Sequence, residues 1–275
     1  MFTGHLKKMD SGLSNPVEYL LVLGEERIGL NQYLGKKLTL IFENQINCIN
    51  CGKNIKKTYN GGYCFNCSQV LARCDLCIFK PQLCHFDQGT CREPKWGEEN
   101  CQISHFVYLS NTSELKVGIT RFTQVPTRWI DQGAISALPI IKVGTRYQSG
   151  IFEVLLSEMV ADKTNWRKML SGDITPINLE MERDHLFEQF GERLDELEME
   201  FGDDQIEILE DEQVVNIEYP VLEYPRKIKS LSLDKIPKIE GTLLGIKGQY
   251  LIFDIGVINI RKHTGYLTTF QAEEK

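Results

Sequence analysis

The sequence predicts an α+β protein with three parts: a small antiparallel sheet with flanking helices, a cysteine-rich metal-binding region, and a β-rich domain built from both ends of the chain. Three observations support this prediction. Short apolar or alternating runs bounded by glycine and proline occur near both ends. All nine cysteines fall between residues 48 and 101. Residues 105–170 alternate between strand-like runs and helical spacing.

Composition excludes several classes of protein. The 275 residues are 42% hydrophobic and 25% charged, which excludes a disordered, fibrous or low-complexity chain. No apolar run approaches the ~20 residues of a membrane span, so we expect no membrane association. The first residues show no apolar core of a secretory signal, which favours a cytoplasmic location. Nine cysteines in such a chain indicate metal ligands rather than a disulfide framework.

The elements follow in order along the chain. We expect strands at 17–23 and 37–42, then the cysteine-rich stretch, then strands at 106–109, 116–120 and 139–143, with a helical turn at 126–132 and a helix at 151–161. A helix at 179–201 and an acidic connection at 202–213 precede further strands at 214–217, 250–253 and 257–260. These elements suggest five segments: 1–44, 45–104, 105–170, 171–213 and 214–275, and the last is expected to pack against the first.

Charge is distributed unevenly. Residues 171–218 contain 2 basic and 17 acidic side chains, a net charge of −15, whereas the rest of the chain totals +8. The overall charge of −7 therefore does not exclude a nucleic-acid partner. The acidic helix is interpreted as a solvated face; a sharper hypothesis is that it covers the central module and excludes nonspecific DNA or RNA.

The first four cysteines have the spacing of a zinc site. Cys48 and Cys51, then Cys64 and Cys67, form two C-x2-C pairs separated by twelve residues. Such pairs converge on one tetrahedral zinc, and four thiolates close its coordination sphere. The sequence therefore predicts a structural zinc here.

A second set of cysteines follows immediately, and its ligands are ambiguous. Five cysteines and the neighbouring His85 and His105 compete for four places. The preferred set for a second structural zinc is Cys74, Cys77, Cys84 and Cys91, with Cys101 as the alternative. The two histidines are interpreted as ordinary polar residues.

Residues 105–129 resemble the front half of a GIY-YIG nuclease module. The run VYL places Tyr108 at the tyrosine of the first motif, and KVG places Gly118 at the glycine of the second, with Lys116 in place of a tyrosine. Arg128 and Glu153 follow where that family has its arginine and its metal-binding glutamate. The segment between the two motifs is shorter than is usual there. The whole chain, with KVGIT, PTRWIDQGA and a cysteine-rich front, resembles most an uncharacterised bacterial family, a domain of unknown function only distantly related to the GIY-YIG group.

The resemblance implies a metal-dependent phosphodiester hydrolase. Glu153 would hold magnesium or manganese, Arg128 would bind a phosphoryl oxygen, and Tyr108 or Lys116 would orient or deprotonate water. Further residues are expected to bind substrate around this set: Gly118, Arg121, Trp129, Gln132 and Arg146. The expected partner is DNA or RNA, because arginines beside an aromatic ring suit nucleic acid.

Each of these residues also has a purely structural interpretation. Tyr108 could be a core aromatic, and Lys116 and Glu153 solvated residues. Arg128 could pair with Asp131 or stack on Trp129. The alternative function is therefore a non-catalytic, zinc-containing module that binds DNA or RNA. A third is an enzyme acting on a modified nucleotide or tRNA.

Overall fold

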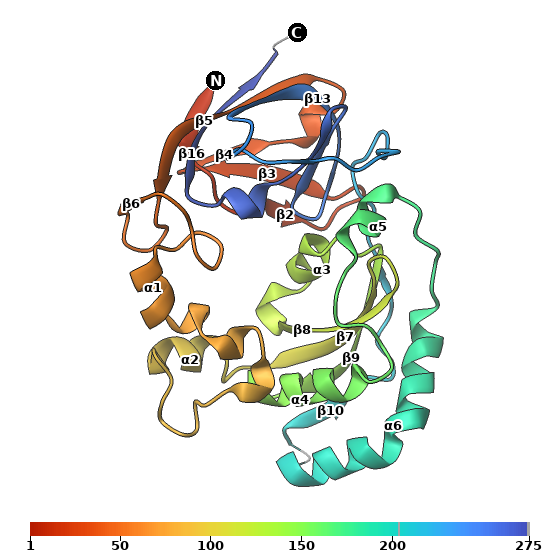
Figure 1. The fold of residues 1–275 in the computed structure, drawn as a ribbon. Coiled ribbons are helices and arrows are strands. Elements are labelled where there is room, and N and C mark those ends of the chain that lie inside the picture. The colour runs from red at the N-terminus through yellow and green to blue at the C-terminus, as the bar shows by residue number, and fades with distance from the viewer. Residues whose placement is uncertain (203, 274–275) are drawn as a thin grey trace.

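The structure is a computed structural model that describes residues 1–202 and 204–273. These residues form three lobes (Figure 1). The terminal lobe combines the two ends of the chain. Its strands are β1 (Phe2–His5), β2 (Asp10–Gly12), β3 (Glu18–Leu23), β4 (Glu26–Gly29), β5 (Lys37–Asn47), β12 (Ser230–Leu231), β13 (Lys238–Lys247), β14 (Tyr250–Phe253), β15 (Gly256–Asn259) and β16 (Tyr266–Ala272), with short 3-10 turns η1 (Asn31–Tyr33) and η6 (Ile260–His263).

Strands from the two ends interleave within one sheet. The order is β1-β16-β5-β13-β14-β15-β12, antiparallel except between β12 and β15, and β2-β3-β4 form a second sheet. β5 lies between β16 and β13, so an N-terminal strand pairs with C-terminal strands on both sides. The prediction of a β-rich domain made from both termini is confirmed.

Alternating side chains explain the core of this lobe. In β13, Ile239, Gly241 and Leu243 are buried while Glu240 and Thr242 between them are more exposed, which is the period-two pattern of a strand with one face inward. Lys247 at the end of β13 is an exception. Its ammonium is buried without a hydrogen-bond partner among the described residues, and it lies 5.2 Å from the Tyr219 ring centroid and 5.5 Å from that of Tyr224.

The cysteine-rich lobe contains only short elements: β6 (Asn54–Ile55), α1 (Phe65–Val70), η2 (Ala72–Cys74), η3 (Leu76–Ile78), η4 (Pro81–Leu83) and α2 (Pro94–Asn100). Its buried cluster consists of four cysteines together with Leu71. Such a small apolar core cannot order this region by burial alone, so the cysteine clusters must contribute to its stability.

The central lobe is built on an antiparallel sheet. β7 (His105–Asn111) lies between β8 (Leu115–Arg121) and β9 (Ser136–Val143). The remaining elements are η5 (Phe122–Gln124), α3 (Thr127–Asp131), α4 (Arg146–Leu156), α5 (Trp166–Ser171), α6 (Leu179–Phe201), β10 (Ile206–Ile208) and β11 (Val215–Asn216). Both β10 and β11 pair with β9. The acidic connection thus contains a strand of the central sheet, and the strand expected near 214–217 joins this sheet instead of the terminal lobe.

The two long helices agree with the sequence to different degrees. α6 has the predicted bounds; Leu186, Phe190 and Leu194 are buried in the central core, and most of its acidic residues are exposed or half-buried. α4 begins five residues earlier than expected. Its N-cap is Thr145, whose hydroxyl accepts from the Gln148 amide while the Gln148 side chain accepts from the Thr145 amide, a capping box.

No helix in residues 1–202 and 204–273 is long and apolar enough to cross a membrane.

Candidate functional site

The side-chain oxygen of Gln132 joins two of the predicted catalytic residues. Tyr108, in the middle of β7, donates its hydroxyl hydrogen bond to Gln132 Oε1 at 3.0 Å. Lys116, in β8, donates from Nζ to the same oxygen at 2.9 Å. Gln132 follows α3 directly, so the loop between β8 and β9 brings this acceptor onto the sheet.

Arg128 and Glu153 complete the group. Arg128, on α3, acts on the Tyr108 hydroxyl through its charge and a hydrogen bond. Glu153, on α4, interacts electrostatically with Lys116 and Arg128. The structure therefore brings together four residues that are up to 45 positions apart in the sequence. We call Tyr108, Lys116, Arg128 and Glu153 the central cluster.

Burial shifts the acid–base properties of the central cluster. Lys116 is 6% exposed, and desolvation, aided by the charge of Arg128, lowers its pKa to about 8. Burial raises the pKa of Glu153, against the opposing charges of Lys116, Arg146 and Arg128. Burial likewise raises the pKa of Tyr108. Perturbed ionisable groups gathered in this way are typical of functional sites, although structural networks show them too.

The aromatic side chains of Tyr108 and Trp129, beside the central cluster's charged residues, lie inside the protein. Tyr108 is 0% exposed and Trp129 is 2% exposed, and their rings meet edge to face at 5.9 Å. Trp129 is buried because α3 packs its apolar residues on the core, as the neighbouring Ile130 shows. It therefore does not offer the exposed stacking surface that was expected.

Gly118 makes room for the Tyr108 ring. The two residues are directly opposite in the β7–β8 register. A Cβ atom at Gly118 would lie 2.8 Å from the Tyr108 hydroxyl oxygen and 2.9 Å from Cζ. The glycine thus permits the tyrosine to lie across the neighbouring strand, which is a positioning role rather than a contact with substrate.

Arg121 and Arg146 attach the central lobe to the cysteine-rich lobe. Arg146 donates from Nη2 to the Ile78 carbonyl at 2.7 Å, and its amide donates to the Cys101 carbonyl at 2.8 Å. Arg121 donates to the side-chain oxygen of Asn100. The two arginines expected to bind substrate thus have structural partners, although the charge of Arg146 also acts on Glu153.

Asp162 is an additional acidic residue near the cluster that the sequence did not indicate. Its charge raises the pKa values of both Lys116 and Glu153. The Val117 amide donates to the Ala161 carbonyl at 2.9 Å, which holds this segment beside β8. Asp162 is exposed and lies in a turn after α4, where an acidic residue has no distinguishing sequence pattern.

The first cysteine group converges as its spacing predicts. The sulfur atoms of Cys48, Cys51, Cys64 and Cys67 all lie within 4.8 Å of one another, and those of Cys51 and Cys64 are 3.8 Å apart. Cys48 follows the end of β5, and Cys64 caps α1. This arrangement is compatible with zinc.

Backbone amides donate to two of these sulfurs and favour the thiolate form of Cys48. The Cys64 amide donates to the Cys48 sulfur at 3.2 Å, and the Cys67 amide donates to the Cys64 sulfur at 3.4 Å. Burial opposes ionisation of Cys48, but the amides of Cys51, Cys64 and Asn50 outweigh it and lower its pKa to about 6. A thiolate is the form that binds zinc, so these hydrogen bonds favour metal binding.

Four cysteines of the second set, which we call the second cysteine group, line a cavity of about 10 Å³ within the cysteine-rich lobe. Its lining contains the sulfur-bearing residues Cys77, Cys84, Cys91 and Cys101 together with Asp75 and His85. Asp75, Cys77 and His85 place ligand atoms within 4.8 Å of one another. Cys74 does not line this cavity; it packs with the first group. The structure thus places Cys101, not Cys74, with the other three cysteines.

The family model described as "Protein of unknown function (DUF2797)" matches residues 35–268. The chain belongs to this family. The match includes all nine cysteines and the whole central cluster, but it excludes most of the strands contributed by the N-terminus. No curated protein and no solved structure matches the chain.

Proposed function

We propose that this protein of the DUF2797 family processes nucleic acid by metal-dependent hydrolysis of phosphodiester bonds at the central cluster. The observation that carries the proposal is that Tyr108 and Lys116 share one acceptor, Gln132 Oε1, while Arg128 and Glu153 lie close enough for their charges to act on both. The strand order β8-β7-β9 with a helix after β9 is also consistent with a GIY-YIG-like core.

Glu153 and Arg128 each have a chemical role in this proposal. Glu153 supplies the carboxylate for magnesium or manganese, with Asp162 close enough to add charge. A divalent ion bound there would polarise the phosphoryl oxygen and stabilise the leaving oxyanion. Arg128 presents a guanidinium to a nonbridging oxygen.

Lys116 is the residue best suited to accept a proton from water. With a pKa of about 8, a fraction of its amine is neutral near pH 7, which an ordinary lysine does not provide. Tyr108 is fully buried and hydrogen-bonded, so its role is to hold Gln132 and through it the Lys116 amine. Tyr108 is accordingly a positioning residue.

The test compares Glu153, on α4, with Glu158, which lies just after the end of this helix. Glu153→Gln keeps the shape of the side chain and removes the charge, whereas Glu158→Gln does the same at an exposed residue paired with Arg193. With labelled single-stranded and structured DNA and RNA in magnesium or manganese, we expect Glu153→Gln to reduce cleavage by at least about 100-fold. Glu158→Gln should retain wild-type cleavage. Equal rates for both variants would refute the proposal.

A second candidate function is a nucleic-acid-binding module without cleavage. The complete burial of the Tyr108 ring favours it, since a buried hydroxyl cannot touch substrate directly. In that case wild-type protein binds oligonucleotides but leaves them intact with every metal tested, and Glu153→Gln changes nothing.

The metal content is proposed to be two structural zinc ions. Four thiols hold the first, Cys48, Cys51, Cys64 and Cys67, and we assign the second to Cys77, Cys84, Cys91 and Cys101. Asp75 pairs with Arg92 at 2.7 Å, and both ring nitrogens of His85 have partners, Nδ1 with Thr90 at 2.7 Å and Nε2 with Asp75 at 3.4 Å. Thiols therefore remain the available donors of the second cavity.

Elemental analysis of purified variants tests the second zinc. Cys84→Ser and Cys101→Ser should each lower the content from two zinc atoms per chain to one. Cys74→Ser should leave it at two. Loss of zinc in Cys74→Ser but not in Cys101→Ser would restore the ligand set first expected from the sequence.

A further inference from the structure

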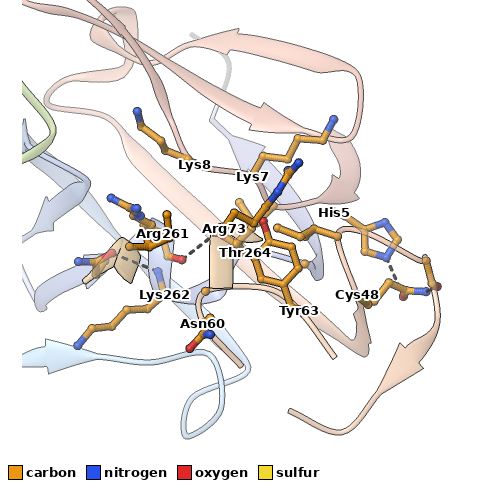
Figure 2. A pocket seen from close by; sticks show the side chains of 18 of the residues that line it. His5, Lys7, Lys8, Cys48, Asn60, Tyr63, Arg73, Arg261, Lys262 and Thr264 are labelled. Carbon is orange, nitrogen blue, oxygen red and sulfur yellow. Dashed lines mark hydrogen bonds between the residues drawn. The ribbon is translucent and has the colours of Figure 1, made fainter. Parts of the chain in front are cut away.

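A large cleft separates the terminal lobe from the cysteine-rich lobe. Its volume is about 1170 Å³, and three segments distant in the sequence line it: residues 5–8, parts of 47–79, and 259–265 (Figure 2). We call it the interlobe cleft. Its lining contains no residue of the central cluster and no cysteine of the second cysteine group.

The interlobe cleft is strongly basic. Lys7, Lys8, Arg73, Arg261 and Lys262 line it, and no acidic residue of the described chain does. Figure 2 shows these five side chains around the same space, contributed by both lobes. Such a concentration of one sign of charge in a concave surface attracts polyanions.

Two of these five cations are already partly neutralised by carboxylates, Arg73 lies over the Trp96 ring with its Cζ 5.8 Å from the centroid, and two remain available. Lys7 lies 3.2 Å from Glu25 and Lys8 lies 2.5 Å from Asp131. Arg261 and Lys262 are exposed and form no ion pair with a described residue. Both residues lie in η6 of the terminal lobe, on the wall of the cleft. The Asn259 side chain caps this turn and so fixes its position.

The cleft contacts neighbours of the central cluster, not the cluster itself, at two places. Lys8 of the cleft pairs with Asp131, the residue before Gln132. Ile78 of the cleft accepts a hydrogen bond through its carbonyl from Arg146, whose charge acts on Glu153. A chain of phosphates lying in the cleft would therefore lead toward the central cluster.

We infer that the interlobe cleft binds the phosphodiester backbone of a single-stranded nucleic acid and delivers it to the central cluster; the inference rests on the proposed function. Exposed aromatic surface favours a single strand, since unpaired bases stack on such rings. Phe79 in the cleft wall is 66% exposed, and Tyr63 lies beside Arg73. DNA and RNA share the backbone chemistry, so both are tested.

The experiment measures binding apart from cleavage. Labelled single-stranded DNA, RNA of the same sequence, and the matching duplex are titrated with zinc-loaded full-length protein without added magnesium or manganese. The double variant Arg261→Glu/Lys262→Glu reverses two cleft charges. Arg226→Glu/Lys227→Glu is the matched control, because this exposed Arg-Lys pair lies in the same lobe outside the cleft.

We expect the cleft variant to weaken single-strand binding by at least 10-fold while the control stays within 2-fold of wild type. The slope of log affinity against log salt should fall by about 1.4, because each phosphate contact on a single strand contributes about 0.7. Unchanged zinc content and thermal unfolding verify that both variants fold. The tighter of the DNA and RNA arms identifies the natural strand.

Several results would overturn the inference: no binding by wild type, equal weakening by both double variants, unchanged affinity of the cleft variant, or tighter binding of the duplex. Failure of the proposed function is a different result. If Glu153→Gln binds and cleaves like wild type, catalysis at the central cluster is refuted, but strand binding in the interlobe cleft is not. If Glu153→Gln loses cleavage and the cleft variant binds with unchanged affinity, only strand binding in the interlobe cleft is refuted.

Discussion

Gly118→Ala tests how tightly the central cluster is packed, whatever its chemistry. The added Cβ would lie 2.8 Å from the Tyr108 hydroxyl oxygen and 2.9 Å from Cζ, closer than Cβ atoms approach other heavy atoms in proteins. The Tyr108 ring has little room to retreat, because it is fully buried and Trp129 packs against it.

The cost follows from two opposing effects. Overpacking of a rigid core costs about 1–3 kcal/mol. Replacing glycine by alanine within a strand returns about 0.5–1 kcal/mol through lower entropy of the unfolded chain. We therefore expect Gly118→Ala to lower the free energy of unfolding by about 1–2 kcal/mol, measured by urea unfolding.

A double-mutant cycle with Tyr108→Leu isolates the contact. Leucine lacks the ring atoms that the new Cβ would meet, so Gly118→Ala should cost nothing or stabilise the protein in that background. An equal cost of Gly118→Ala in both backgrounds would refute the assignment of Gly118 as the residue that accommodates Tyr108.

Three further predictions concern stability and metal content. Lys247→Met should raise the free energy of unfolding at pH 7 by on the order of 3 kcal/mol or less, because burial lowers the pKa of Lys247 to about 8 in the folded protein. Below pH 8 the folded wild type bears the full cost of a buried ammonium, so the stability gained by Lys247→Met should shrink as pH rises from 8 toward 10.5. Urea midpoints at pH 7, 8 and 9.5 check this, and a stability gain that grows with pH would contradict it. Gln132→Leu leaves the donors of Tyr108 and Lys116 without their shared acceptor and should cost about 1–3 kcal/mol in the same assay, whereas an unchanged midpoint would argue against that hydrogen-bonded arrangement. Cys51→Ser should remove one zinc atom per chain and increase proteolysis of residues 45–70, measured by elemental analysis and limited digestion, and full zinc content would exclude Cys51 as a ligand.

Local patterns were sufficient for three elements of the central lobe, β7, β8 and α6. Alternating runs gave the strands β7 and β8 within two residues, and α6 was predicted with its observed bounds because its apolar stripe is regular. The start of α4 was missed although the signal was present. Thr145 and Gln148 have the spacing of a capping box, whereas Ser149 and Gly150, which resemble a helix start, lie within the first turns of the helix.

Features that depend on tertiary contacts could not be predicted in this way. Spacing alone cannot separate Cys74 from Cys101 as a neighbour of Cys77, because the choice depends on how α2 folds back on the lobe. Burial of Trp129 depends on the packing of α3 on the core. The interlobe cleft gathers its cations from both ends of the chain and from the cysteine-rich lobe, so no single segment of the sequence contains its pattern.

The most direct test of the central cluster is a kinetic double-mutant cycle on strand cleavage. Single-turnover rate constants are measured with manganese for wild type, Glu153→Gln, Lys116→Met and the double variant. Residues that act as one catalytic unit give strongly non-additive losses. We expect each single variant to lose at least about 100-fold in cleavage rate and the double variant to be hardly slower than either. Rates of wild-type size in both single variants, or losses that simply multiply in the double variant, would contradict it.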